Sequence, residues 1–277
     1  MPTLPTSDSD PVANSHHRRR TAESFGLDAA RYHRARPRYP AALLGPLVAA
    51  FPGRSVLDVG CGTGIVAHQL HALGCQVLGV EPDPRMADFA RGTGVEVETA
   101  TLETWDPAGR LFDAVVAGQT WHWVDPVAGA RQAARALRPR GVFSAFWNVE
   151  QPPAELAAAF AEVYRTETPD SMHIRRWTTQ DPDPSAPLRE KTVVGLADAG
   201  GFDEPHHHPV TWQHTYSRDQ WLDQLPTQGG HADLAADTMA AIQAGIGAAI
   251  DRAGGSVVIH GATTAVTARR LGGSGRG

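Results

Sequence analysis

The sequence predicts an α/β protein built on a mostly parallel sheet with helices on both of its faces. Three observations support this fold. Short apolar runs alternate with helical patterns from residue 40 to residue 148, as in proteins whose parallel strands are joined by crossover helices. The first run ends in a glycine-rich turn that leads directly into a helical pattern. The second run ends in a carboxylate, Glu81, which would stand at the same edge of the sheet.

Five strands are expected in the first half of the chain, because each is a short run of β-branched or apolar residues between turn residues. They cover residues 55–59, 76–80, 95–99, 112–117 and 142–147. Helical patterns precede the first strand and join most of the others, and they cover residues 21–35, 41–50, 65–73, 83–91 and 127–137. Asp83 is a candidate N-cap of the fourth of these helices.

After residue 148 the spacing of the elements changes. A loop rich in proline and aspartate is expected at residues 178–187, and helices are expected at 154–166, at 192–199, after Ser217 and at 232–252. Strands are expected at residues 202–216 and 256–267, where β-branched and aromatic residues follow glycine pairs. The late helices would form a small cap on the sheet.

The glycine-rich turn carries the most specific signal for a ligand. Asp58 precedes three glycines at alternate positions, Gly60, Gly62 and Gly64, where the absence of a Cβ lets a backbone approach a ligand closely. Dinucleotide folds favour a longer glycine spacing, and the lysine of a phosphate-binding loop is missing. Glu81, 17 residues after Gly64, could accept both ribose hydroxyls of an adenosine.

Residues 57–64 together with residues 79–83 resemble the first two motifs of the class I S-adenosylmethionine-dependent methyltransferases. The resemblance implies a Rossmann-like, seven-stranded sheet in which the seventh strand lies antiparallel between the fifth and the sixth. It also implies transfer of a methyl group from S-adenosylmethionine to an O-, N- or C-nucleophile of a small-molecule acceptor, which leaves S-adenosylhomocysteine. We therefore expect this cofactor and an enzyme of the transferase class.

The same resemblance assigns a cofactor-binding role to residues at the carboxyl edge of the sheet. Asp58 would hold the amino-acid end of the cofactor and Glu81 the ribose, while Met86 either packs on the adenine ring or belongs to the core. The other residues expected to bind the cofactor come from the loops after the first four strands: Gly60, Cys61, Gly62, Thr63, Gly64, Pro82, Thr101, Leu102, Gly118 and Gln119.

Past the fourth strand, residues 118–126 place His122 between two tryptophans. This segment resembles methyltransferases of the small-molecule type, with the trans-aconitate methyltransferase-like proteins as one branch. The opening segment around residues 25–40 is similar to the same group, which makes Tyr32 and Arg36 candidates for closing the pocket of the methionyl end. At residues 228–231, where similar proteins tend to carry polar side chains, this chain reads Gln-Gly-Gly-His.

His122 is the candidate catalytic residue. Its side chain titrates near neutral pH and could accept a proton from a phenol or an amine acceptor, whereas a carboxylate acceptor would need no base. The alternative is that His122 holds the turn in place by a hydrogen bond.

Composition excludes several classes of partner. A net charge of −5 with 20% charged residues gives no basic surface for nucleic acid, and no apolar run is long enough for a membrane. Cys61 and Cys75 are too few for a disulfide framework, so a reduced, cytoplasmic location is expected. The histidines at 206–208, 68 and 71 lack metal-ligand spacing, so no metal is expected.

The expected organisation is one methyltransferase domain between two disordered ends. It comprises a leader at 1–21, the domain at 22–270, its cofactor-binding core at 40–148, cap or substrate segments at 150–190 and 217–253, and a tail at 271–277. Two other functions stay open, namely a non-methylating reaction such as a cyclisation in the same cofactor pocket, and a non-enzymatic ligand-binding protein. A nicotinamide oxidoreductase is disfavoured by the glycine spacing. The sequence does not indicate the oligomeric state.

Overall fold

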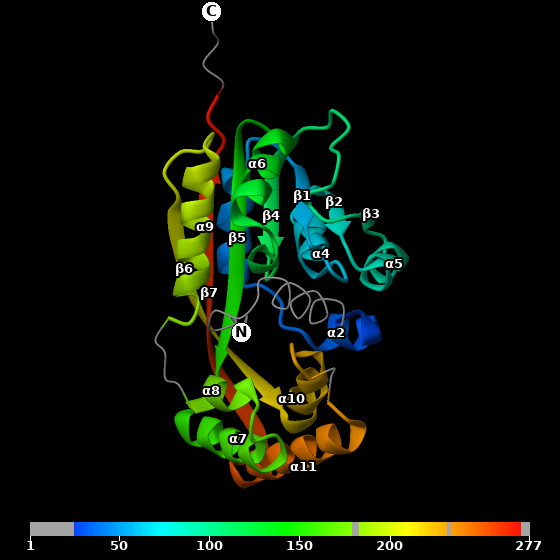
Figure 1. Ribbon diagram of the computed structural model, residues 1–277, viewed down its shortest axis with the longest axis vertical. Helices are drawn as coiled ribbons and strands as arrows, with labels where there is room; N and C mark the ends of the chain where they lie inside the picture. Colours follow the sequence, from blue (N-terminus) through cyan, green and yellow to red (C-terminus); the bar gives the residue numbers. More distant parts are fainter. Residues whose placement is uncertain (1–24, 179–182, 232–233, 273–277) are drawn as a thin grey trace, which may run out of the picture.

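A computed structural model of the chain describes residues 25–178, 183–231 and 234–272. Its centre is a seven-stranded sheet with the order β3-β2-β1-β4-β5-β7-β6 (Figure 1). The first five strands pair in parallel, and β7 pairs antiparallel with both β5 and β6, which confirms the expected place of the last strand. The strands are β1 (Ser55–Val59), β2 (Gln76–Glu81), β3 (Glu96–Thr99), β4 (Phe112–Gly118), β5 (Leu137–Gln151), β6 (His206–Ser217) and β7 (Ser256–Arg269).

Helices cover both faces of this sheet, as the sequence predicts, because successive strand residues point to opposite sides. Val56 belongs to the apolar core beneath α3 and α4, whereas Leu57 belongs to the core beneath α6 and α9. The helices in chain order are η1 (Phe25–Asp28), α2 (Ala29–Ala35), α3 (Ala41–Ala50), α4 (Ile65–Ala72), α5 (Pro84–Gly92), η2 (Trp121–Trp123), α6 (Pro126–Ala136), α7 (Ala154–Glu167), α8 (Met172–Thr178), α9 (Ala186–Ala199), α10 (Arg218–Gln224), η3 (Leu225–Thr227) and α11 (Ala236–Arg252).

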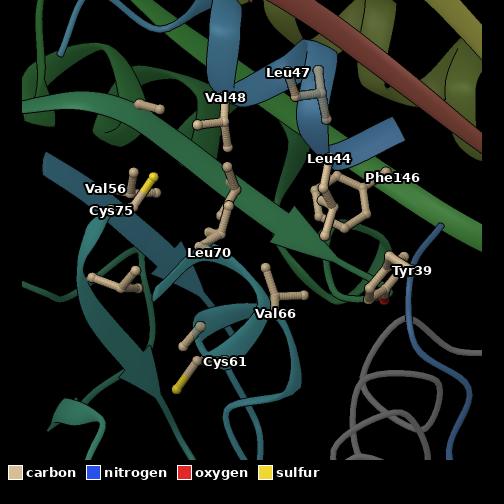
Figure 2. Packing of buried hydrophobic residues seen from close by; sticks show 14 of the residues in the cluster. Tyr39, Leu44, Leu47, Val48, Val56, Cys61, Val66, Leu70, Cys75 and Phe146 are labelled. Carbon is tan, nitrogen blue, oxygen red and sulfur yellow. The ribbon is translucent and has the colours of Figure 1, made fainter. Parts of the chain in front are cut away.

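The first apolar core extends to the carboxyl edge of the sheet. Figure 2 shows Tyr39 packed edge-on against Phe146, with ring centroids 4.7 Å apart, and Cys61 and Val66 in the same cluster. Cys61 belongs to the glycine-rich turn and Val66 to the first turn of α4. Packing of the core therefore holds the turn in place.

Four helices, α7, α8, α10 and α11, form a separate group that we call the helical cap. It lies beyond the C-terminal end of β6 and the N-terminal end of β7 (Figure 1) and has its own apolar core. Phe160 of α7 stacks on Trp221 of α10, and Trp177 of α8 meets both rings. The strand residues Tyr216 and Val257 complete this core, so the cap is joined to the sheet through apolar contacts.

Several predicted boundaries need correction. Strand β5 extends past both ends of the predicted 142–147 segment, because Leu137 pairs with Phe112 of β4 and β7 supplies partners as far as Gln151. Helix α8 was not predicted, and α9 begins at Ala186, inside the predicted loop, because Pro187 occupies the first turn, where a helix tolerates proline. Strand β6 begins at His206, four residues later than predicted, and Phe202 makes an isolated bridge to Arg270.

The boundaries of the predicted core segment and of the predicted cap segments stay predictions. Helix α9, whose first residues fall in the predicted 150–190 segment, packs on α6 against the sheet. The predicted leader at 1–21 and residues 273–277 of the predicted tail lie outside the described residues. Within the described part of the chain, we find no helix with the length and apolar character needed to cross a bilayer.

Candidate functional site

The glycine-rich turn joins the end of β1 to the start of α4 in a backbone shape that favours glycine. The φ angles are 58° at Gly60, 55° at Gly62 and 84° at Gly64. Residues other than glycine rarely adopt such positive values. A Cβ on Gly60 would also lie 2.1 Å from Cγ2 of Thr120. The amide N–H of Gly60 donates to the carbonyl of Val80 at 2.7 Å, so the start of the turn stays paired with the end of β2.

Glu81 connects the end of β2 to this turn. Its Oε2 accepts a hydrogen bond from the Gly62 N–H at 2.8 Å, and its Oε1 accepts one from the Asp83 N–H at 2.9 Å. Burial raises the pKa of Glu81 to about 7, and the two N–H donors act in the opposite direction. Each oxygen keeps acceptor capacity, since a carboxylate oxygen can accept more than one hydrogen bond.

Asp58, next to the end of β1, is the most unusual group of the site. It is 1% exposed, and neither carboxyl oxygen has a hydrogen-bond partner of ordinary geometry among the described residues. Burial and then the charge of Glu81 raise the pKa of Asp58 to about 8, while the nearby N–H of Ala67 lowers it slightly. A buried acid without partners indicates a place for a ligand with hydrogen-bond donors.

The two acids and the turn line one cavity at the carboxyl edge of the sheet. Most of the residues expected to bind the cofactor share this cavity. They are Tyr32, Arg36, Asp58, Gly60, Cys61, Gly62, Thr63, Glu81, Pro82, Met86, Gly118 and Gln119. Gln119 has a φ of 57°, a strained value for a residue with a side chain, and strain of this kind is frequent at functional sites.

Four predicted residues do not line the cavity, which corrects the expectation that all of them meet there. Gly64 lies behind the turn, where a Cβ would meet Val95 at 3.0 Å. Leu102 is buried in the core of the opposite sheet face, and Thr101 is exposed and bonded to Thr104. The sequence shows that the turn after β3 is near the site but not which way its side chains point.

His122 is the fourth of these residues. Its side chain is buried in η2, where its Nδ1 accepts a hydrogen bond from the indole N–H of Trp147 at 3.4 Å. Its ring also packs against that of Trp123, which does line the cavity. This contact supports a role in holding the turn, and the geometry gives no support to the base role.

Sequence reasoning missed several lining residues, which come from the segment around Tyr39, the start of α4, the segment after β4, and β5: Pro37, Tyr39, Ile65, Val66, Thr120, Trp123 and Asn148. Asn148 could have been found, because it directly follows the predicted fifth strand at the carboxyl edge. Its carbonyl oxygen accepts a hydrogen bond from Gln119 Nε2 at 3.0 Å.

Helix α2 lies between the turn and the helical cap (Figure 1). His33 forms hydrogen bonds of 3.1 Å through Nδ1 with the carbonyl oxygen and the hydroxyl of Thr63 in the turn. Arg34 donates to Asp223 of α10 at 2.9 and 3.0 Å. The guanidinium of Arg36 stands 5.3 Å from the centre of the Tyr32 ring. The helix thus connects the cavity to the cap.

Comparisons with known proteins agree with this geometry. A family model described as a methyltransferase domain matches residues 57–145. An uncharacterized methyltransferase of Mycobacterium tuberculosis is 38% identical over 47% of this chain and 54% of its own length, so the chain spans about half the length of that relative. The ubiquinone biosynthesis O-methyltransferase of a Methylobacterium species is 30% identical over 66% of this chain and 75% of that protein.

Among solved structures, a candidate type II methyltransferase from Anaeromyxobacter dehalogenans superposes with a TM-score of 0.61. It is 23% identical, and the match covers 85% of this chain and 98% of that protein. At this identity the likeness supports the fold alone. The family assignment rests instead on the sequence relatives.

The raised pKa of Asp58 predicts a dependence of stability on pH. The unfolded chain, with an ordinary carboxyl pKa near about 4, loses its proton first as pH rises. Between that value and about 8 the folded protein therefore holds more protons, and its free energy of unfolding falls with rising pH.

We expect Asp58→Asn to remove this contribution. Its stability relative to the wild type should increase with pH by up to about 1.4 kcal/mol per pH unit in that window. Urea unfolding at a series of pH values measures the difference, and Asp198→Asn, at an exposed position of α9, is the matched control. A difference between Asp58→Asn and the wild type that does not change with pH would contradict the account.

Proposed function

The chain belongs to the class I S-adenosylmethionine-dependent methyltransferases, and we propose that it transfers the methyl group of S-adenosylmethionine to a small-molecule acceptor. The observation that carries this proposal is the pair of buried acids beside the glycine-rich turn. Asp58 has no hydrogen-bond partner of ordinary geometry among the described residues, and Glu81 keeps acceptor capacity toward the same cavity. A ligand with an amino group and ribose hydroxyls supplies the donors that both acids need.

The residues of the cavity fit each part of this cofactor. Asp58 would receive the amino group and Glu81 the ribose hydroxyls. Arg36 is half-buried, and among the described residues no carboxylate forms an ion pair with it, so it is suited to the cofactor's carboxylate. Met86, buried on α5, and Pro82 offer apolar contacts for the adenine ring.

When bound, S-adenosylmethionine supplies a methyl carbon on a cationic sulfur, and the electrons of the breaking carbon–sulfur bond stay with the sulfur. The task of this chain is to hold donor and acceptor in line, which accounts for much of the rate in such a reaction. Trp123 lines the cavity, and aromatic rings stabilise nearby cations. Helix α2 covers the turn and restricts the access of water.

Glu81→Gln tests the cofactor assignment. It removes the negative charge from the group proposed to hold the ribose, so we expect binding of S-adenosylhomocysteine to weaken by about 1.5–3 kcal/mol. Titration calorimetry measures the affinity. The matched control is Glu96→Gln, an exposed acid at the start of β3 that should leave the affinity unchanged. Equal affinities of Glu81→Gln and the wild type would remove Glu81 from the ribose site.

For His122 we expect a structural role. His122→Ala leaves the buried indole N–H of Trp147 without its acceptor, so the free energy of unfolding should fall by about 1–3 kcal/mol. Urea unfolding measures this loss, and calorimetry should show unchanged affinity for S-adenosylhomocysteine. A variant with wild-type stability that forms no S-adenosylhomocysteine from the cofactor and an acceptor would instead restore the base role.

A further inference from the structure

The helical cap and the loop after η3 hold buried polar atoms that the proposed cofactor site does not use. Within the described residues, three of them have no hydrogen-bond partner and belong to neighbouring side chains: Nε of Arg176, Oε1 of Gln224 and Nε2 of Gln228. Gln224 is fully buried and Gln228 is 3% exposed. A buried polar atom without a partner is costly, so a group of them in one place indicates a ligand.

Glu150 connects this group to the cofactor cavity. It lies two residues beyond Asn148 on β5, so the two side chains share a face of the strand about 7 Å apart. Its Oε1 accepts a hydrogen bond from the hydroxyl of Tyr216 at 2.9 Å, and its Oε2 accepts one from Nε2 of Gln224 at 2.7 Å. Glu150, which belongs to the cluster, is therefore the next residue on the same face of β5 after Asn148, which lines the cavity.

The existing hydrogen bonds decide which atoms stay available. The amide nitrogen of Gln224 donates a hydrogen bond to Glu150, so the amide oxygen of Gln224 is the unpartnered acceptor. The amide oxygen of Gln228 accepts a hydrogen bond from the Arg176 guanidinium at 2.5 Å, so the amide nitrogen of Gln228 is an unpartnered donor. Burial lowers the pKa of Arg176 to about 10, the charge of Glu150 acts in the opposite direction, and the guanidinium stays cationic at neutral pH. Besides the carboxylate of Glu150, the cluster thus presents two unpartnered donors, one of them on a cation, and one unpartnered acceptor.

We infer that this cluster recognises the methyl acceptor, and that the acceptor is a small hydroxy or amino acid whose carboxylate binds Arg176 and Gln228. Gln224 then accepts a hydrogen bond from the hydroxyl or amino group of the same molecule. The inference rests on the proposed function, because it places the methyl acceptor beside the proposed cofactor cavity.

The loop that carries Gln228 is built to hold it in place. His231 bonds through Nε2 to the hydroxyl of Tyr164 at 2.8 Å, and its ring stacks on that of His173 at 4.1 Å. Gly230 has a φ of 89°, and a Cβ there would come within 3.3 Å of His173. The unusual Gln-Gly-Gly-His segment of the sequence therefore presents Gln228 to Arg176.

The first experiment measures carboxylate recognition in the full chain saturated with S-adenosylhomocysteine. The probes are mandelate and lactate, each beside its primary amide, and calorimetry measures binding. We expect the acids to bind and the amides to bind at least about tenfold more weakly, because the amides lack the charge that pairs with a guanidinium. Equal binding of acids and amides, or binding of neither, would overturn the inference.

Variants then locate the site. Arg176→Gln should weaken binding of the acids by about tenfold to a hundredfold, with affinity for S-adenosylhomocysteine unchanged. Gln228→Glu places a competing carboxylate beside Arg176 and should abolish binding of the acids in a folded protein, so it decides the matter if Arg176→Gln does not fold. The matched control is Arg175→Gln, an exposed arginine of the same helix, which should bind the acids as the wild type does.

Two further outcomes separate the possible failures. Wild-type binding of the acids by Arg176→Gln, or an equal loss in Arg175→Gln, would overturn the inference and leave the proposed function intact. A wild-type protein that does not bind S-adenosylhomocysteine would contradict the proposed function itself, and the acceptor site with it.

Discussion

The burial of two carboxyl groups, Asp58 and Glu81, beside the glycine-rich turn is the constraint on which the rest of the site depends. Because β1 and β2 run parallel and adjacent, both acids stand at the same edge of the sheet. Desolvation raises the pKa of both groups, and only Glu81 has backbone donors of ordinary geometry that offset it. The site therefore suits a ligand that brings hydrogen-bond donors to Asp58.

The remainder of the fold surrounds this pair. Packing of Cys61 and Val66 in the first core holds the turn, and α2 covers it through His33. The same helix is bonded to α10 through Arg34, so the wall of the cavity and the helical cap are joined directly. This ion pair is exposed and contributes little stability on its own, but it places the cap beside the cavity. The cofactor site and the inferred acceptor site are thus connected by both α2 and β5.

Local signals were enough to predict the fold of the first half of the chain. The bounds of β1 and α3 agree with the prediction, and the glycine spacing with Glu81 indicated the ligand class, because each depends on residues close together in the sequence. The turn after β3 was harder, since Leu102 could face either the cavity or the core. The acceptor cluster could not be predicted, because its members come from β5, α8, α10 and the loop after η3, and no periodicity connects them.

The most direct test of the central claim is the number of protons released when S-adenosylhomocysteine binds near neutral pH. Calorimetric titrations in two buffers with different ionisation enthalpies measure it, with NADH as the control ligand. The pKa values of Asp58 and Glu81, about 8 and about 7, should fall when the cofactor's donors reach them. We therefore predict release of about one proton. Binding without release of a proton, or binding of NADH alone, would contradict the account.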